Sequence, residues 1–306
     1  MAKRRTDWTG VFVVSVTPFD DNGDIDEPAF RRLMDQFVAD GVQGIIVAGS
    51  TGEWYTLSDA ERLRLFELAQ DQVAGRVKLI AGTSAISTRD TVALTQSASD
   101  RGYDGAMVLA PPYALPNERE LLGHFEAVAG VGLPIMAYNN PGRTQVTITP
   151  AFAEKLAKFP TIVALKDSSK DLYALADTLN RIGGDVAVFC GLEPYAMAMI
   201  GRGAVGTVSM AANIIGRRAV DFCGHLLAGR YREARPLEAA IDRLYEAFYV
   251  GGYGAYVVIK ACMNLAGRPG GLPRRPHLPV DAAGLDKLRQ VLAGIGALDG
   301  KARAAE

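Results

Sequence analysis

The sequence predicts an α/β fold, a (β/α)8 TIM barrel followed by a C-terminal helical extension. Short apolar runs rich in β-branched residues alternate with amphipathic stretches over about the first 230 of the 306 residues. The chain holds eight such strand–helix units of roughly 25–30 residues, and eight parallel strands joined by right-handed crossovers close into a barrel. The residues after them have mainly helical patterns, interrupted by a Gly/Pro-rich segment at 267–279.

Each apolar run is expected to form one strand that is buried on both faces, as in parallel sheets. The predicted strands are Val11–Val16, Gly44–Ala48, Val77–Ala81, Gly105–Leu109, Pro134–Tyr138, Ile162–Lys166, Val186–Cys190 and Ala204–Val208. We therefore expect a barrel at residues 1–230, with the active site at the carboxyl ends of its strands, and a helical extension at residues 231–306.

Several helix starts are visible between these strands. Ser58 followed by Glu61 is a capping box and predicts a helix over 58–73. Thr88 is the expected N-cap of a second helix, and Thr149 precedes a proline at the first position of a third. These segments supply the crossovers that a parallel barrel requires.

An open doubly wound sheet is the alternative architecture. Gly201–Gly206 fits the G-x-G-x-x-G pattern of nucleotide-binding turns. That pattern needs a strand before it and a helix after it, whereas here a helical segment comes first and a strand follows. The glycines are therefore interpreted as turn residues.

Composition and charge exclude several classes of protein. A formal net charge of −1 gives no basic surface for nucleic acid or for an anionic membrane. No run of about 18 uncharged apolar residues is present to cross a membrane. The basic start at residues 3–5 leads into a polar stretch, unlike a signal peptide.

Cysteines and histidines are few and scattered. The three cysteines lack CxxC spacing, which suits reduced thiols and a cytoplasmic protein. His124, His225 and His277 are far apart in sequence and suggest neither a zinc site nor a Ser-His pair. We therefore expect catalysis without a metal or any other cofactor.

Lys166 is a single cation at the end of a run that otherwise reads as a buried strand. Burial disfavours the ammonium form and lowers the pKa, which makes a lysine a nucleophile able to form a Schiff base with a carbonyl substrate. The alternative is a lysine that reaches solvent or pairs with Asp167 or Asp171. Polar residues at the other strand ends favour the interpretation of Lys166 as a nucleophile.

Two other strand ends carry such groups. The second strand leads into a Gly-Ser-Thr-Gly-Glu turn at residues 49–53, whose N–H groups and hydroxyls suit a small carboxylate. The fifth strand ends at Tyr138, which could move protons at a carbinolamine oxygen. The segment after it contains Arg143, whose guanidinium can bind a second carboxylate through two N–H groups. Because barrel strands end at one rim, these groups and Lys166 are expected to share a site.

These blocks resemble the signature segments of the dihydrodipicolinate synthase / N-acetylneuraminate lyase family, and are most similar to the synthases. The matching segments are Gly49–Glu53, Tyr138–Arg143, Leu165–Asp167, Val14–Phe19 and Gly206–Asn213, so the resemblance covers nearly the whole chain. The family consists of class I pyruvate aldolases, which form a Schiff base on a (β/α)8 barrel with a C-terminal helical extension.

The resemblance implies four catalytic residues. Lys166 forms the imine with pyruvate, and Tyr138 is the acid/base, hydrogen-bonded to Thr51. Synthases often carry two tyrosines after strand four, one in a proton relay and one reaching across a dimer interface. This sequence has only Tyr113, in a segment that is one residue shorter, so either Tyr113 takes the relay role in a shifted loop or the relay is incomplete.

The resemblance also implies the residues that bind substrate. Ser50 and Thr51 hold the pyruvate carboxylate, and the backbone of Gly191 and Val208 lies near the bound pyruvate. Arg143 matches the arginine with which synthases bind the carboxylate of the aldehyde, a residue that sialic-acid lyases generally lack.

The resemblance therefore predicts a lyase, first of all a 4-hydroxy-tetrahydrodipicolinate synthase of lysine biosynthesis, which condenses pyruvate with aspartate semialdehyde. A 2-keto-3-deoxy sugar-acid aldolase or dehydratase, or an N-acetylneuraminate lyase-like enzyme, is the alternative, since these share the Gly-Ser-Thr-Gly-Glu turn. A catalytically silent barrel that binds a keto acid is an alternative of a different class. The expected partners are pyruvate or another 2-keto acid, an aldehyde, and further copies of the chain in a homodimer or homotetramer.

Overall fold

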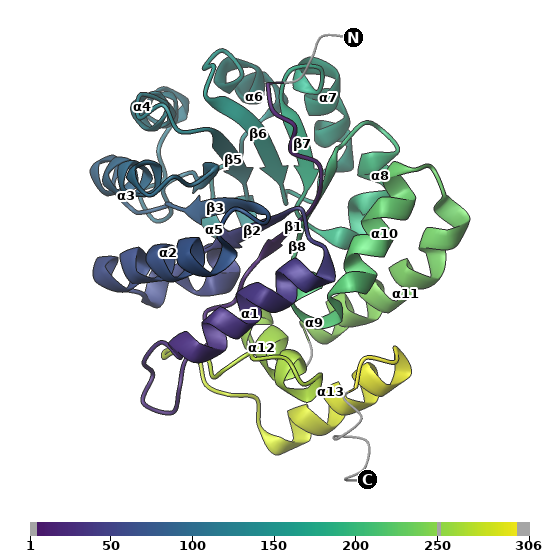
Figure 1. The fold of residues 1–306 in the computed structure, drawn as a ribbon. Coiled ribbons are helices and arrows are strands. Elements are labelled where there is room, and N and C mark those ends of the chain that lie inside the picture. The colour runs from purple at the N-terminus through teal and green to yellow at the C-terminus, as the bar shows by residue number, and fades with distance from the viewer. Residues whose placement is uncertain (1–4, 250–251, 299–306) are drawn as a thin grey trace.

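The computed structural model describes residues 5–249 and 252–298, which form a closed barrel of parallel strands surrounded by helices (Figure 1). The strands are β1 (Gly10–Val14), β2 (Gly44–Val47), β3 (Lys78–Gly82), β4 (Gly105–Leu109), β5 (Ile135–Asn139), β6 (Ile162–Asp167), β7 (Ala187–Cys190) and β8 (Gly206–Ser209). Each strand pairs with the next one in sequence, and β8 also pairs with β1. The predicted TIM barrel is confirmed.

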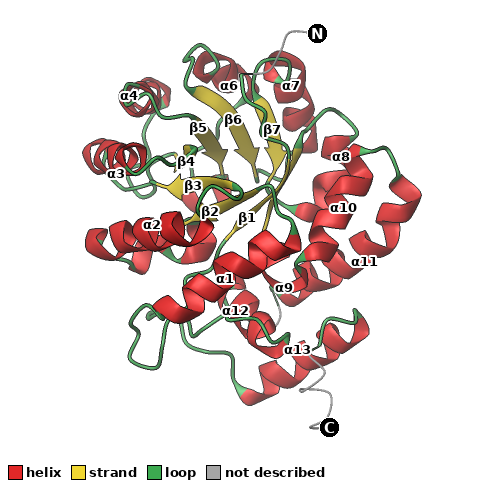
Figure 2. Cartoon of the chain, viewed as in Figure 1, coloured by secondary structure: helices red, strands yellow, loops and turns green. Residues whose placement is uncertain are grey.

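The helices lie outside the strands, and the last of them extend beyond the barrel at the lower edge of Figure 2. They are α1 (Glu27–Asp40), α2 (Asp59–Val73), α3 (Thr88–Asp100), α4 (Glu118–Ala129), α5 (Pro141–Thr144), α6 (Pro150–Leu156), α7 (Leu172–Ile182), α8 (Ala196–Ile200), α9 (Ala212–Ile215), α10 (Arg217–Leu227), α11 (Tyr231–Ala247), α12 (Ala255–Leu265) and α13 (Ala282–Gly294). Short 3-10 turns are η1 (Ser50–Gly52), η2 (Trp54–Thr56) and η3 (Glu193–Tyr195). The division of the chain at residue 230 stays a prediction, and residues 299–306 of the expected extension lie outside the described part.

Two separate hydrophobic clusters show which way the side chains of each strand point. One cluster fills the space between the sheet and the helices, and it includes Ile135 and Leu165. The other fills the inside of the barrel, and it includes Tyr138 and Ala164. Because side chains alternate along a strand, Lys166 faces the same way as Ala164, toward the inside of the barrel.

All eight predicted strands agree with the observed ones to within two residues at each end, and the two largest differences have local causes. The strand β1 ends at Val14 rather than at Val16, because the N–H of Val16 donates to Oδ1 of Asn213 instead of joining the ladder. The strand β8 begins at Gly206 rather than at Ala204. At Gly206 the two strands β8 and β1 lie so close together that a Cβ on this residue would lie 2.0 Å from the carbonyl oxygen of Gly10.

The predicted helix starts are right at two of three places. Ser58 forms a capping box with Glu61 at the start of α2, and Thr149 caps α6. The expectation that Thr88 caps α3 is wrong. The hydroxyl of Ser87 accepts from the N–H of Asp90, and the Thr88 hydroxyl bonds instead with Nδ1 of His124 at 2.9 Å.

The glycine motif at 201–206 forms a turn after α8 and then enters β8, as its reversed order predicted. It therefore has no helix opening on it in the way that a nucleotide-binding turn requires.

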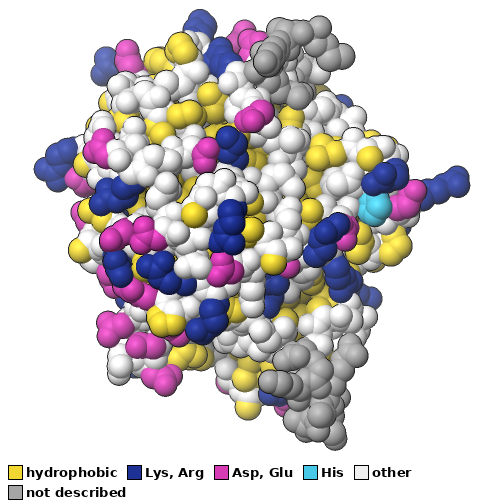
Figure 3. Space-filling model, viewed as in Figure 1, with side chains coloured by type: hydrophobic (Ala, Val, Ile, Leu, Met, Phe, Trp, Pro, Cys, Tyr) yellow, Lys and Arg dark blue, Asp and Glu magenta, His cyan; other side chains and the backbone are white. Residues whose placement is uncertain are grey.

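Charged side chains of both signs are interspersed on the face shown in Figure 3, in keeping with the net charge of −1. Among residues 5–249 and 252–298, no helix has the length and hydrophobicity that crossing a membrane requires.

Candidate active site

Lys166 lies on β6 inside the barrel, where it pairs in register with Tyr138 of β5 and with Phe189 of β7. It is only 4% exposed, and its Nζ lies 3.8 Å from the centroid of the Tyr138 ring. Burial lowers the pKa of Lys166 to about 7, although the carboxylate of Glu193 acts in the opposite direction. A large part of the amine is therefore neutral near pH 7 and can act as a nucleophile.

Tyr138 is also buried, and burial raises the pKa of its hydroxyl, so the phenol keeps its proton. The hydroxyl accepts a hydrogen bond from Nδ2 of Asn140 at 2.8 Å. The expected hydrogen bond to Thr51 is not among the contacts of the described residues. When a neutral amine has added to a carbonyl carbon, a neutral phenol beside it can donate a proton to the former carbonyl oxygen, which then leaves as water.

The turn after β2 is η1, which holds Ser50 and Thr51 in buried positions. The carbonyl of Gly52 accepts from the hydroxyl of Thr17 at 2.8 Å. The next residue, Glu53, has a φ of 56°, in the left-handed region. Such a backbone is unfavourable for glutamate, and it is retained because the Glu53 side chain forms a buried ion pair with Lys260 of α12.

Gly191 follows β7 directly and lies close to the candidate nucleophile. A Cβ at this position would lie 2.1 Å from Oγ of Ser168 and 3.0 Å from Cε of Lys166. Only glycine fits there without displacing these side chains. Val208 is fully buried on β8 and belongs to the cluster inside the barrel.

A cavity of about 410 Å³ lies beside this group of residues. Its lining mixes tyrosine, tryptophan and aliphatic side chains with one arginine and one histidine: Ser50, Trp54, Tyr55, Ile86, Leu109, Pro112, Tyr113, Arg143, Thr144, Tyr256 and His277. Leu109 pairs with Tyr138 across β4 and β5, so the cavity approaches the Lys166–Tyr138 pair from that side. A cavity of this size and mixed lining suits a small polar molecule.

Arg143 lies on α5, and its guanidinium carbon is 5.1 Å from the centroid of the Tyr256 ring. Tyr256 belongs to α12 and is almost fully buried, which raises the pKa of its hydroxyl to about 12. This contact and the cavity lining place the exposed arginine side chain in the cavity wall, where its guanidinium can bind a carboxylate.

Tyr113 lines the same cavity but is 90% exposed, and its φ of 69° is left-handed. Its hydroxyl has no hydrogen-bond partner within the described part of the chain. A proton relay between Tyr113 and Tyr138 is therefore not assembled within the described residues of this single chain.

Sequence reasoning missed three residues of the site. Asn140 stands inside the block after β5 that resembles the family, but its sequence position indicates no role. Tyr256 and His277 come from the C-terminal helices and from the segment between them, more than 100 residues from the barrel strand that carries Tyr138. No local pattern links such distant positions, and His277 has no second histidine near it in sequence to signal a site.

Comparisons with known proteins identify one family. The model of the dihydrodipicolinate synthetase family matches residues 7–295. The chain is 45% identical to a Rhizobium meliloti protein named as an uncharacterized DapA-like lyase, over 94% of this chain and 96% of that one. It is 42% identical to the 4-hydroxy-tetrahydrodipicolinate synthase of Thermus thermophilus, over 76% of this chain and 79% of that one.

A solved structure gives the same result for the fold. YagE, an E. coli K12 prophage protein of the dihydrodipicolinic acid synthase family solved with pyruvate, superposes with a TM-score of 0.91 at 28% identity. The match covers 95% of this chain and 100% of that one. The family match spans nearly the whole chain, and the barrel fold is that of the solved relative. The chain therefore belongs to the dihydrodipicolinate synthetase family of lyases.

Proposed function

We propose that this protein is a Schiff-base-forming pyruvate aldolase or lyase in which Lys166 is the nucleophile. The observation that carries the proposal is the buried Nζ of Lys166, which has a pKa of about 7 and lies 3.8 Å from the centroid of the Tyr138 ring. Family membership supports the same reaction class, and the related YagE was solved in complex with pyruvate.

The proposed reaction follows from these two side chains. The Lys166 amine adds to C2 of pyruvate, and Tyr138 supplies the proton with which the former carbonyl oxygen leaves as water. The resulting iminium ion loses a proton from C3 to the Tyr138 phenolate and becomes an enamine. C3 of the enamine then bonds to the carbonyl carbon of an aldehyde, whose oxygen takes the proton from Tyr138 and becomes a hydroxyl. With an aldehyde that has no amine, hydrolysis of the product imine releases the 2-keto acid and the free lysine. With aspartate semialdehyde, the amine of the substrate attacks the imine carbon, which closes the ring and displaces the lysine.

The proposed acceptor is aspartate semialdehyde, which makes the enzyme a 4-hydroxy-tetrahydrodipicolinate synthase. Arg143 supports this choice because it offers a cation in the cavity wall for the carboxylate of the aldehyde. The activity named for the Thermus thermophilus relative is in agreement.

A second candidate is a 2-keto-3-deoxy sugar-acid aldolase or dehydratase. The observation in its favour is the polar pair Tyr55–His277, which lies in the cavity wall and suits a hydroxylated substrate. A catalytically silent keto-acid-binding barrel would retain the imine but show no turnover with any aldehyde.

Borohydride trapping tests the proposal. Reduction in the presence of pyruvate should add the mass of a reduced pyruvyl group to Lys166 and abolish activity. Lys260 is the matched internal control, since burial lowers its pKa to about 8 but it is ion-paired with Glu53. An unmodified protein, or an adduct on Lys260, would refute the assignment of the nucleophile.

We also infer that the enzyme acts in the cytoplasm as a homodimer or homotetramer. The support for an oligomer is the 90% exposure of Tyr113 in a left-handed backbone, which a neighbouring copy would cover. Sedimentation velocity of the purified protein tests this, and a monomer at micromolar concentration would contradict it.

A further inference from the structure

Glu193 is a buried carboxylate just beyond the strand end that packs against Lys166. It is the first residue of η3, which follows β7, and it is only 1% exposed. Gly191, two residues earlier, is the glycine whose Cβ would lie 3.0 Å from Cε of Lys166. Glu193 does not belong to the cavity lining. The fold thus brings a carboxylate to the neighbourhood of the lysine without exposing it to the cavity.

Three donors hold the Glu193 carboxylate. Oε1 accepts from the N–H of Ala211 at 3.0 Å and from the hydroxyl of Ser209, and Oε2 accepts from the hydroxyl of Tyr245. The Ser209 oxygen itself accepts from the N–H of Ala212 at 2.9 Å. The Tyr245 oxygen accepts from the N–H of Glu193 at 3.2 Å. Each hydroxyl therefore has its hydrogen left for the carboxylate, and the position of Glu193 is fixed by neutral groups.

Glu193 differs from the other two buried glutamates of the described chain in having no cationic partner. Glu53 forms an ion pair with Lys260, and Glu238 forms one with Arg235. Within residues 5–249 and 252–298, no lysine, arginine or histidine forms an ion pair with Glu193. A buried charge without a partner of opposite sign is costly, so its retention calls for a reason.

The titratable groups on which the Glu193 charge acts come from several elements. They include Cys190 of β7, Cys223 of α10 and Tyr245 of α11. Burial raises the pKa of the Tyr245 hydroxyl and of both thiols, that of Cys223 to about 12, so these three groups stay neutral. Lys166 on β6 is the remaining one. Burial lowers its pKa to about 7, and the Glu193 carboxylate opposes this by favouring the cationic form.

The proposed reaction creates a positive charge at the lysine nitrogen. The neutral amine carries none, whereas the iminium ion formed with a 2-keto acid carries a full one. A cation in a buried site is unfavourable unless a negative charge acts on it, and such charges interact more strongly there than in water. A carboxylate that is already fixed by hydrogen bonds does so without rearranging when the charge appears.

We propose that Glu193 supplies the fixed negative charge that stabilises the iminium ion on Lys166. Tyr245 and Ser209 are the positioning residues that hold this carboxylate in place. The proposal rests on the proposed function and adds to it a residue outside the cavity lining that acts on the intermediate through its charge.

Two variants remove this charge by different routes. Glu193→Gln keeps the shape of the side chain: the amide oxygen can accept from Ser209 and Ala211, and the amide nitrogen can donate to the Tyr245 oxygen. Glu193→Leu/Tyr245→Phe removes the carboxylate together with its tyrosine donor, so no phenol is left without an acceptor. Glu193→Asp keeps the charge on a shorter side chain and serves as the rescue variant.

Brief incubation with pyruvate, borohydride reduction and mass spectrometry measure the imine on Lys166 as a function of pH and of pyruvate concentration. Imine formation by the wild type should rise with pH with a midpoint at the lysine pKa of about 7. Without the carboxylate, this midpoint should fall by about one pH unit, because the ammonium form loses a favourable charge. At about pH 8.5, where the amine is largely neutral in all variants, half-maximal trapping should need about tenfold more pyruvate, because the iminium ion loses the same charge. Glu193→Asp should keep both values close to those of the wild type.

A matched control separates this effect from a general loss of structure. Glu238→Gln removes another buried carboxylate, one that lies on α11 and pairs with Arg235. It should change neither the pH midpoint nor the pyruvate concentration for half-maximal trapping. The melting temperature of each variant reports on folding, and either charge-removing variant that remains folded decides the test.

The outcomes separate this inference from the proposed function. Trapping that weakens equally at every pH with an unchanged midpoint would assign Glu193 a structural role and refute the inference. Unchanged values in a folded charge-removing variant, a Glu193→Asp that behaves like Glu193→Gln, or unfolding of both charge-removing variants would refute it as well. In each of these cases pyruvate trapping at Lys166 in the wild type still stands. A wild type that traps no pyruvate would overturn the proposed function and this inference together.

Discussion

The buried ion pair between Glu53 and Lys260 allows a prediction of stability that does not depend on the substrate. The two side chains are each 1% exposed, and Nζ of Lys260 also donates to the carbonyl of Leu272 at 2.8 Å. Glu53→Gln keeps the shape of the side chain and its acceptor for the N–H of Arg274, but leaves the Lys260 cation without its carboxylate. Removing one partner of a buried pair costs about 3–5 kcal/mol.

This cost translates into a measurable change of melting temperature. At about 2.1 cal/mol/K per residue, the 306 residues unfold with an entropy of about 0.64 kcal/mol/K, so the melting temperature should fall by about 5–8 °C. The double variant Glu53→Gln/Lys260→Met removes both charges and should recover most of the loss. Calorimetry or circular dichroism at pH 7.5 checks both values. A single variant within about 1 °C of the wild type, or a double variant whose loss equals the sum of the two single losses, would refute the reasoning.

Three further predictions concern the site. Tyr138→Phe should keep the fold and lose about 10²–10⁴-fold in kcat, the scale of a positioned acid/base, whereas a near-wild-type rate would make Tyr138 a core residue only. Arg143→Ala should lower kcat/KM for aspartate semialdehyde by about tenfold or more while pyruvate trapping at Lys166 survives, and an unchanged kcat/KM would remove Arg143 from carboxylate binding. The pKa of Lys166 is about 7 in the folded protein and near 10.4 in an unfolded chain, so the unfolded state binds more protons between these values. Wild-type stability should therefore rise with pH across that window, and Lys166→Met should melt higher than the wild type at pH 6 by a margin that shrinks toward pH 10.

Much of the fold could be predicted because it depends on local patterns. The alternation of apolar runs and amphipathic segments indicates eight strands in the right order. The period of two along β6 also places Lys166 inside the barrel, on the same face as Ala164. Strand ends were less predictable, since the end of β1 depends on the side chain of Asn213, about 200 residues away.

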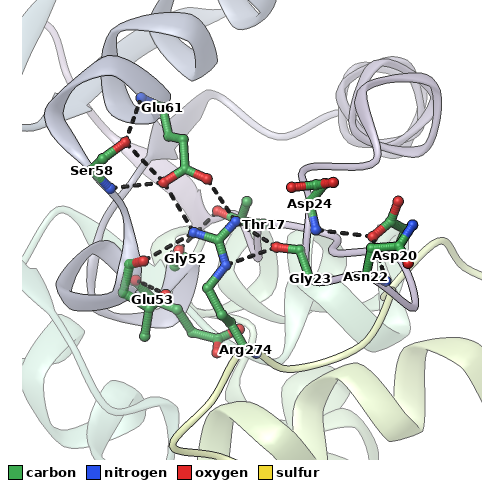
Figure 4. Close-up of polar contacts among 11 residues, drawn as sticks. Thr17, Asp20, Asn22, Gly23, Asp24, Gly52, Glu53, Ser58, Glu61 and Arg274 are labelled. Atoms are coloured by element: carbon green, nitrogen blue, oxygen red, sulfur yellow. Dashed lines mark hydrogen bonds and ion pairs between the residues drawn. The ribbon is translucent and has the colours of Figure 1, made fainter.

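The candidate site could be predicted only where its residues follow barrel strands. Ser50, Tyr138 and Lys166 stand at such positions, and their spacing in sequence reflects the repeat of the fold. His277 reaches the cavity because the segment before it is anchored by Arg274 to Gly23 and Glu61, more than 200 positions earlier in the chain (Figure 4). Contacts of that range leave no period in the sequence, so the contribution of the C-terminal region to the cavity needed the structure.

Two buried lysines differ in the groups around them, and the difference supports the proposal that Lys166 is the nucleophile. Burial lowers the pKa of both Lys166 and Lys260. Lys260 is ion-paired with Glu53 and bonded to a backbone carbonyl, so its ammonium form is held in place and its nitrogen is not free to react. Lys166 forms no ion pair within the described part of the chain and faces an aromatic ring. Deprotonation of its amine therefore breaks no ion pair. Burial alone therefore does not make a lysine a nucleophile. The absence of a paired carboxylate is what distinguishes Lys166, and a carboxylate placed beside its Nζ should raise its pKa and slow imine formation.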